Sequence, residues 1–147
     1  MDFCVADAAI AHIEAIEELE KQCFSQPWTR EQLISQLPDE RHEFLAALHE
    51  GRPVGYVGMM CVLDEGYIAN VAVSPDWRRQ GIGDALIAEL LRRAVSRELA
   101  FVTLEVRAGN EAAKALYAKH GFVPVGLRKK YYASPTEDAV LMTKFLK

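Results

Sequence analysis

The chain has 147 residues, 50% of them hydrophobic and 26% charged, a composition typical of a globular domain with one core. No apolar run approaches the ~20 residues that a membrane-spanning helix needs. The first 20 residues contain no Lys or Arg, so we expect no secretory signal and no membrane partner. The net charge of -4 lacks the basic bias of nucleic-acid-binding proteins, so no nucleic-acid partner is expected.

The cysteines and histidines do not have the spacing of a disulfide framework or a metal site. Cys4, Cys23 and Cys61 are odd in number and widely separated, and the four histidines form no ligand motif. We therefore expect no metal and a reducing, cytoplasmic location.

The first third of the chain predicts a short strand and two helices. The strand is expected near residues 3–5. A helix should follow, because four apolar residues recur at helical spacing: Ile10, Ile13, Ile16 and Leu19. After the loop Phe24-Ser25-Gln26-Pro27-Trp28, Thr29 and Gln32 form a capping box for a second short helix, which Pro38 should end.

The middle of the chain is rich in β-strand patterns. Apolar segments at 44–49, 54–63 and 67–73 are separated by turn sequences at 50–53 and 64–66. Because the connections are short, we expect an antiparallel meander.

A strand-turn-helix unit comes next. The glycine turn Arg78-Arg79-Gln80-Gly81-Ile82-Gly83 precedes a helix expected at 83–96, whose apolar stripe is Leu86, Ile87, Leu90, Leu91 and Ala94. A strand at 101–106, a helix from Asn110 to Gly121 and strands at 123–131 and 139–145 complete the chain. The pattern predicts one α+β domain over residues 1–147, with a mixed sheet flanked by helices.

The glycine turn is a candidate anion site. Gly81 and Gly83 leave the first N–H groups of the helix open, and these groups favour a phosphate or pyrophosphate. Arg78 and Arg79 could add positive charge. The alternative is a tight strand-to-helix turn with incidental arginines, because short glycine patterns are common.

Two longer blocks resemble the GCN5-related N-acetyltransferase (GNAT) superfamily. The stretch from Asn70 to Leu86 is similar to its cofactor motif. The other half of the family pattern is matched by Leu104-Glu105-Val106, Asn110, Ala115-Leu116-Tyr117 and Gly121-Phe122. The resemblance implies a mostly antiparallel sheet with a splayed central strand pair, and acetyl-CoA as the cosubstrate.

The same resemblance implies which residues bind the cofactor. Strand backbone would hold the pantetheine arm, the turn would hold the pyrophosphate, and the next helix start would contact the arm. These residues are Val71, Ala72, Val73, Arg79, Gln80, Gly81, Ile82, Gly83, Asp84 and Asn110. Many members carry Arg or Lys where this chain has Asp84, so we expect that carboxylate to point away from the pyrophosphate.

Two residues fall at catalytic positions of the family. Glu105 would be the general base, acting directly or through a water, and Tyr117 would be the acid toward the leaving thiolate. Without the resemblance, Glu105 reads as an exposed strand carboxylate and Tyr117 as a core tyrosine. The backbone N–H of Val73 is the expected oxyanion donor.

The C-terminal block resembles the branch that acetylates protein N-termini. Its sequence Arg128-Lys129-Lys130-Tyr131-Tyr132 and residues 137–142 are similar to RimI-type enzymes, which acetylate the N-terminal alanine of a small-subunit ribosomal protein. By this resemblance, Trp28, Tyr131 and Tyr132 would line a peptide groove, and transfer would be direct within a ternary complex. The alternatives are a small-molecule amine acetyltransferase and a non-catalytic module that binds acetyl-CoA.

Overall fold

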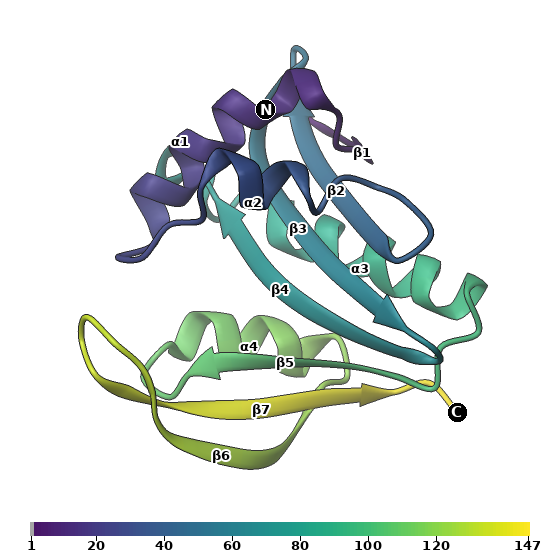
Figure 1. Cartoon of the computed structure of the whole chain (residues 1–147), viewed down its shortest axis with the longest axis vertical. Helices are drawn as coiled ribbons and strands as arrows, with labels where there is room; N and C mark the ends of the chain where they lie inside the picture. Colours follow the sequence, from purple (N-terminus) through teal and green to yellow (C-terminus); the bar gives the residue numbers. More distant parts are fainter. Residues whose placement is uncertain (1) are drawn as a thin grey trace.

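The structure, a computed structural model, describes residues 2–147 (Figure 1). One sheet contains seven strands in the order β1-β2-β3-β4-β5-β7-β6. The strands are β1 (Cys4–Asp7), β2 (His42–His49), β3 (Arg52–Val62), β4 (Glu65–Val73), β5 (Phe101–Arg107), β6 (Val123–Tyr132) and β7 (Glu137–Phe145). The helices are α1 (Ile13–Cys23), α2 (Arg30–Ile34), α3 (Ile82–Ser96) and α4 (Glu111–Lys119), with short 3-10 turns η1 (Ile10–His12) and η2 (Pro75–Trp77).

Helices cover both faces of the sheet, so the α+β prediction is confirmed. In Figure 1, α1 and α2 lie over one face of the β2–β4 region, whereas α3 lies on the other. The smaller core cluster joins α1 and α2 to Phe44, Tyr56 and Ala72. The larger joins α3 to the opposite face and continues to Tyr117 and Phe122.

The apolar stripe predicted for the first helix is right for three residues and wrong for one. Ile13, Ile16 and Leu19 are buried against the sheet, but Ile10 is 63% exposed. Ile10 belongs to η1, where the backbone winds at three residues per turn, so the α-helical spacing does not extend back to it.

The capping box of the second helix is confirmed. The Thr29 hydroxyl accepts from the Gln32 N–H at 3.2 Å, and the Gln32 carboxamide accepts from the Thr29 N–H at 2.8 Å. The helix ends at Ile34, before Pro38 is reached.

The predicted meander is confirmed, with small shifts at its ends. Strands β2, β3 and β4 pair antiparallel in sequence order. The first strand starts and ends later than expected, at Cys4–Asp7, and pairs with β2. The hairpin turn is confined to Glu50 and Gly51, both with positive φ, because Arg52 already pairs with His49.

The central strands β4 and β5 are parallel and diverge along their length. They pair only where Glu65–Tyr67 faces Phe101–Thr103, and they separate beyond that point (Figure 1). The splayed pair implied by the family resemblance is therefore present. Residues 68–73 of β4 have no strand partner on the side facing β5.

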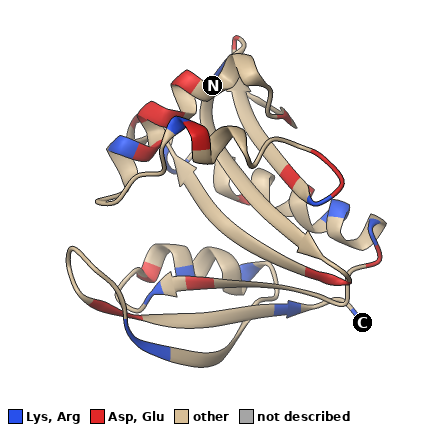
Figure 2. Ribbon diagram, in the orientation of Figure 1, with Lys and Arg blue, Asp and Glu red and all other residues tan. Residues whose placement is uncertain are grey.

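Strand β6 is an edge of the sheet, and its basic segment lies on that edge. Figure 2 shows Arg128–Lys130 as one basic stretch of β6, whereas the charged residues of α1 are mostly acidic. Within residues 2–147, no helix has the length and hydropathy needed to cross a membrane.

Candidate active site

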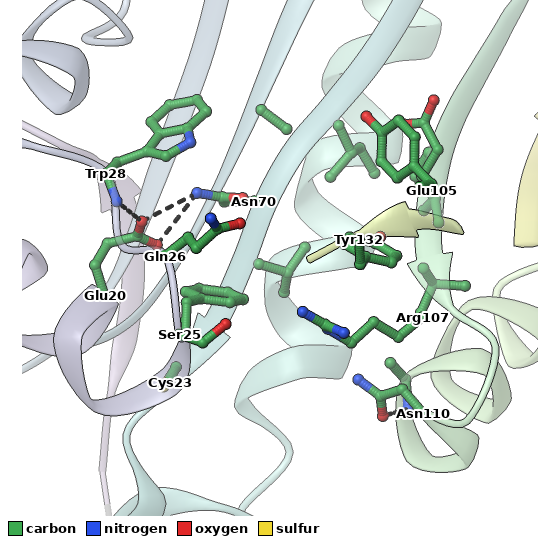
Figure 3. A pocket seen from close by; sticks show the side chains of 18 of the residues that line it. Glu20, Cys23, Ser25, Gln26, Trp28, Asn70, Glu105, Arg107, Asn110 and Tyr132 are labelled. Carbon is green, nitrogen blue, oxygen red and sulfur yellow. Dashed lines mark hydrogen bonds between the residues drawn. The ribbon is translucent and has the colours of Figure 1, made fainter. Parts of the chain in front are cut away.

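A cavity of about 830 Å³ occupies the region where β4 and β5 separate. Its lining comes from the end of α1 and the following loop, from β4 and β5, from α4, and from the β6–β7 turn (Figure 3). Seven of the predicted site residues line it: Trp28, Val71, Glu105, Asn110, Tyr117, Tyr131 and Tyr132. Folding thus brings together residues that are far apart in sequence.

The backbone of β4 offers hydrogen-bonding groups to this gap. The Ser74 N–H donates to the Val54 carbonyl of β3 at 2.8 Å. Because N–H and C=O groups alternate sides along a strand, Ala72 also faces β3, whereas Val71 and Val73 face the gap. Of the three β4 residues expected to bind the pantetheine arm, Val71 and Val73 present their backbone groups to the gap, and Ala72 presents its groups to β3.

The glycine turn contains two residues in the left-handed conformation. Gly81 caps α3 with φ of 82°, and Arg79 has φ of 64°. A Cβ on Gly83 would lie 3.1 Å from a methyl group of Leu116, a tight contact that would require that side chain to shift. Ile82 is core, and Arg78 turns inward to the Val73 carbonyl at 3.4 Å.

The Asp84 carboxylate is held by the end of α4. It lies 3.0 Å from Nε2 of His120 and 3.1 Å from Nζ of Lys119. The hydrogen bond from His120, and then that from Lys119, lowers the pKa of Asp84 below its usual value. The two contacts give this carboxylate hydrogen-bonding partners of its own at the end of α4, which supports our expectation that it does not face the pyrophosphate.

Glu105 projects into the cavity from the middle of β5. Its neighbours Leu104 and Val106 are buried on the other face, as the alternating pattern predicted. The Glu105 side chain is 29% exposed, and its Oε1 lies 3.4 Å from Nε of Arg128 on β6. The carboxylate is therefore accessible to a ligand and has one cationic neighbour that the sequence did not reveal.

Tyr117 is buried on α4, and its ring packs on Phe122 with centroids 5.7 Å apart. Within residues 2–147, no group hydrogen-bonds to the Tyr117 hydroxyl. Every fully buried side-chain oxygen among these residues has a partner, so the Tyr117 hydroxyl is not fully buried and is open to the cavity that Tyr117 lines. Burial raises the pKa of Tyr117 to about 12, with a smaller contribution from Tyr132. The phenol is consequently a protonated hydrogen-bond donor at neutral pH.

Glu20 is a site residue that sequence reasoning missed. It is fully buried on α1, yet it lines the cavity, and it accepts hydrogen bonds from the Trp28 N–H at 2.7 Å and from the Tyr56 hydroxyl. The Asn70 amide lies 3.2 Å from the same carboxyl group (Figure 3). Glu20 thereby joins the Trp28 loop to β4. The helical pattern did not indicate it, because an acidic residue next to Leu19 is normally interpreted as part of the solvent-exposed edge of the helix.

Burial makes Glu20 a source of pH-dependent stability. Desolvation raises its pKa from 4.5 to about 7, against the lowering effects of the Trp28 and Asn70 hydrogen bonds. The folded state therefore binds this proton more tightly than the unfolded state, and stability falls as the pH rises from about 4.5 through 7. Between pH 5 and pH 8, the free energy of unfolding of the wild type should fall by on the order of 2 kcal/mol relative to that of Glu20→Gln, measured by urea unfolding.

Glu43→Gln is the matched control for this measurement. Glu43 is also a buried carboxylate, but it pairs with Arg93 at 3.1 Å and Arg97 at 2.6 Å. Its replacement removes one of the carboxylates paired with Arg93 and the carboxylate paired with Arg97, so it should destabilise the protein at pH 8. A Glu20→Gln difference that stays constant from pH 5 to 8 would show that Glu20 does not titrate in this range.

Tyr131 and Tyr132 form the wall opposite the Trp28 loop. Their rings meet edge to face with centroids 5.1 Å apart, and Tyr131 is 50% exposed. Burial, and next the Glu105 carboxylate, raises the pKa of Tyr132 to about 12. Across the cavity, the Trp28 side chain packs on the α1–α2 core cluster and also contributes to the lining.

The splayed strand pair and the cavity lie in the same part of the fold. Among residues 2–147, no cluster of three or more His, Cys, Asp or Glu side chains could hold a metal ion. The model of the acetyltransferase (GNAT) family matches residues 13–122. The chain therefore belongs to the GNAT family, and it is an N-acetyltransferase that uses acetyl-CoA.

Within this family, the chain is similar to enzymes that acetylate a ribosomal protein. The ribosomal protein bS18-alanine N-acetyltransferase of Escherichia coli K12 is 35% identical over 132 residues, covering 88% of each chain. The corresponding enzyme of Haemophilus influenzae is 32% identical over 136 residues, covering 90% of this chain and 92% of the relative. The crystal structure of the ribosomal-protein-S18-alanine N-acetyltransferase from E. coli superposes with a TM-score of 0.92, at 31% identity, over 99% of this chain and 95% of that chain.

Proposed function

We propose that this acetyltransferase modifies the α-amino group of a protein N-terminus, and that its acceptor is the N-terminal alanine of ribosomal protein bS18. The observation that carries the proposal is the single cavity in which Glu105 and Tyr117 lie between the gap-facing β4 backbone and an aromatic wall. Similarity to the bS18-modifying enzymes over nearly the whole chain supports the choice of acceptor.

In the proposed mechanism, the β4 backbone and the glycine turn bind acetyl-CoA. The gap-facing N–H and C=O of Val71 hold the pantetheine arm as an added strand would. The Val73 C=O already accepts from Arg78, so Val73 contacts the acetyl end of the cofactor through its N–H. The turn N–H groups at Gly81 and beyond hold the pyrophosphate. The acceptor peptide enters between the Trp28 loop and the Tyr131–Tyr132 wall, so its amine approaches the acetyl group within a ternary complex.

The proton balance assigns roles to Glu105 and Tyr117. An α-ammonium group has a pKa near ~8, so the acceptor must lose a proton before attack and another as the amide forms. Glu105 accepts protons from the nitrogen, directly or through a water. As the carbon–sulfur bond breaks, Tyr117 donates a hydrogen bond to the sulfur, and the thiolate then takes one proton from solvent. Glu105 passes the two protons it accepts, one after the other, to solvent, so one proton is released overall. The Val73 N–H stabilises the oxyanion between these steps.

The function is tested by comparing protein N-termini in cells with and without this protein. We expect mass spectrometry to show that acetylation of the bS18 N-terminal alanine is lost when the protein is absent. The purified enzyme should also acetylate a peptide copied from the bS18 N-terminus. The same peptide with a blocked N-terminus and a free lysine is the control, because its amine pKa near ~10.4 leaves far less neutral amine at pH 7.5.

A small-molecule amine remains the second candidate acceptor. It shares the cofactor site and the two catalytic residues, so only the acceptor distinguishes it. An unchanged set of N-termini in the deletion strain, together with acetylation of free amino acids or polyamines by the purified protein, would reject the N-terminal function in its favour. Release of thiol with no amine acceptor would instead indicate a module that binds acetyl-CoA without acetylating an amine.

A further inference from the structure

Arg107 lies at the end of β5 and lines the cavity, but none of the proposed catalytic steps uses it. Its guanidinium donates to the carbonyl of Pro135 at 2.9 Å and to that of Ala133 at 3.1 Å. The Tyr132 ring lies against the same guanidinium, with its centroid 4.5 Å from Cζ. One side chain therefore fixes both the β6–β7 turn and the aromatic residue that precedes it.

Glu137 extends this arrangement to the cofactor side of the cavity. Its Oε1 lies 3.2 Å from Nη1 of Arg107, and its Oε2 accepts from the Gly109 N–H at 2.6 Å. A Cβ on Gly109 would lie 2.7 Å from that oxygen, so only glycine fits there without a shift. Gly109 immediately precedes Asn110, whose side chain caps α4.

We propose that Arg107 is a positioning residue for the acceptor. This role rests on the proposed function: Arg107 holds Tyr132 and the 133–135 turn together as one rigid wall of the peptide groove. The guanidinium suits this task because its planar fork bonds several oxygens at once and stacks on an aromatic ring. It does not contact the reacting atoms, so its loss should weaken acceptor binding more than it slows the chemical step.

Arg107→Lys is the test variant, because lysine keeps the positive charge but lacks the planar fork. We expect the KM for the bS18 N-terminal peptide to rise about tenfold, the effect of losing one strong charge-assisted contact. The kcat and the acetyl-CoA dissociation constant, the latter measured by calorimetry, should change by less than about threefold.

Arg97→Lys is a closely matched control. Arg97 bonds one carboxylate and two carbonyls, namely Glu43 at 2.6 Å, Glu40 at 2.7 Å and Asp39 at 3.1 Å, and its side chain is 27% exposed against 28% for Arg107. It lies at the end of α3 and does not line the cavity. If Arg97→Lys loses as much thermal stability as Arg107→Lys but keeps the wild-type peptide KM, the loss of stability is the general effect of replacing a guanidinium that bonds several oxygens.

A double-mutant cycle tests whether Arg107 acts through Tyr132. If it does, Arg107→Lys should raise the peptide KM much less in a Tyr132→Leu background than in the wild type. If the Arg107→Lys and Tyr132→Leu substitutions instead change KM independently, so that their separate factors multiply in the double variant, the proposal is overturned. So would an Arg107→Lys KM no higher than that of Arg97→Lys, or equal losses in kcat and acetyl-CoA affinity.

A spectroscopic readout separates this inference from the proposed acceptor. In protein labelled with ¹³C-tyrosine, Arg107→Lys should shift or broaden the Tyr132 ring signals, and Arg97→Lys should leave them unchanged. Failure of the wild type to acetylate the bS18 peptide would reject the proposed acceptor, whereas unaltered Tyr132 signals in Arg107→Lys would reject the positioning role.

Discussion

Replacing Glu105 with Gln lowers kcat by at least about tenfold near neutral pH, if proton removal contributes ~1.4 kcal/mol or more to lowering the barrier. General-base catalysis commonly contributes more, on the order of a hundredfold. The substitution keeps the size of the side chain and its place on β5 between buried Leu104 and Val106. The measurement is steady-state acetylation of the bS18 peptide at saturating acetyl-CoA.

The pH dependence of the Glu105→Gln variant provides a second test. Without a base, the acceptor must arrive as the neutral amine, and the fraction of neutral amine rises until the pH passes its pKa near ~8. The variant should therefore recover part of its deficit between pH 7 and pH 9. Equal turnover of the variant and the wild type at pH 7 would reject the base role.

Asp7→Asn is the control for loss of a strand carboxylate. Asp7 lies on β1 and pairs with Arg93, away from the cavity, so it also provides an ion-paired acid on a strand. We expect a change in stability and an unchanged kcat. A fall in kcat similar to that of Glu105→Gln would mean that lost ion pairing, not lost basicity, explains both results.

Tyr117→Phe should lower kcat about tenfold or more while leaving acetyl-CoA affinity nearly unchanged, since it removes one hydrogen-bond donor acting as the thiolate leaves. The Phe122 contact at 5.7 Å between ring centroids is kept, so the fold should be intact. With the pKa of Tyr117 near 12, the hydroxyl stays protonated across the working range. Wild-type turnover in the variant would exclude this role.

The raised pKa also refines how Tyr117 acts. A thiolate with a pKa near ~8.5 is a weaker base than the phenolate of Tyr117 in this buried position, so complete proton transfer from Tyr117 to sulfur is uphill. Donation of a hydrogen bond as charge develops on sulfur is the favourable part of the step. The rate should accordingly show no decline caused by ionisation of Tyr117 below about pH 11.

Tyr56→Phe is the control for loss of a buried tyrosine hydroxyl. The Tyr56 hydroxyl bonds Glu20 inside the α1–α2 cluster and does not line the cavity. Its removal should lower the free energy of unfolding by about 1 kcal/mol and leave kcat unchanged. A fall in kcat as large as that of Tyr117→Phe would indicate a general effect of destabilisation on turnover.

Much of the fold was predictable because its signals are local. The Thr29–Gln32 capping box, the alternation around Glu105 and the glycine turn each depend on residues within one or two helical turns or a single strand. The misplacement of Ile10 shows the limit of such signals. Helical spacing cannot tell where a 3-10 turn replaces the first turn of an α-helix.

The family pattern placed Glu105, Asn110 and Tyr117 at one site, and the structure brings them into one cavity. It did not identify the side chains that support them. The Arg128 contact to Glu105 and the Glu20 link between α1 and β4 join residues that no local pattern places together. Taken alone, Arg128 is interpreted as part of a basic run on the surface, and Glu20 as an acidic residue at the edge of a helix.

The sequence by itself therefore determined the order of the elements, the α+β class and the glycine turn of an acetyltransferase, because hydrophobic period, caps and turns act over a few residues. Only the tertiary structure decided which polar and charged side chains meet. Glu20 and Asn70 are 50 residues apart, Asp84 and His120 are 36 apart, and Arg107 and Glu137 are 30 apart. Such pairs depend on strand register and helix packing over the whole domain, which no local pattern specifies.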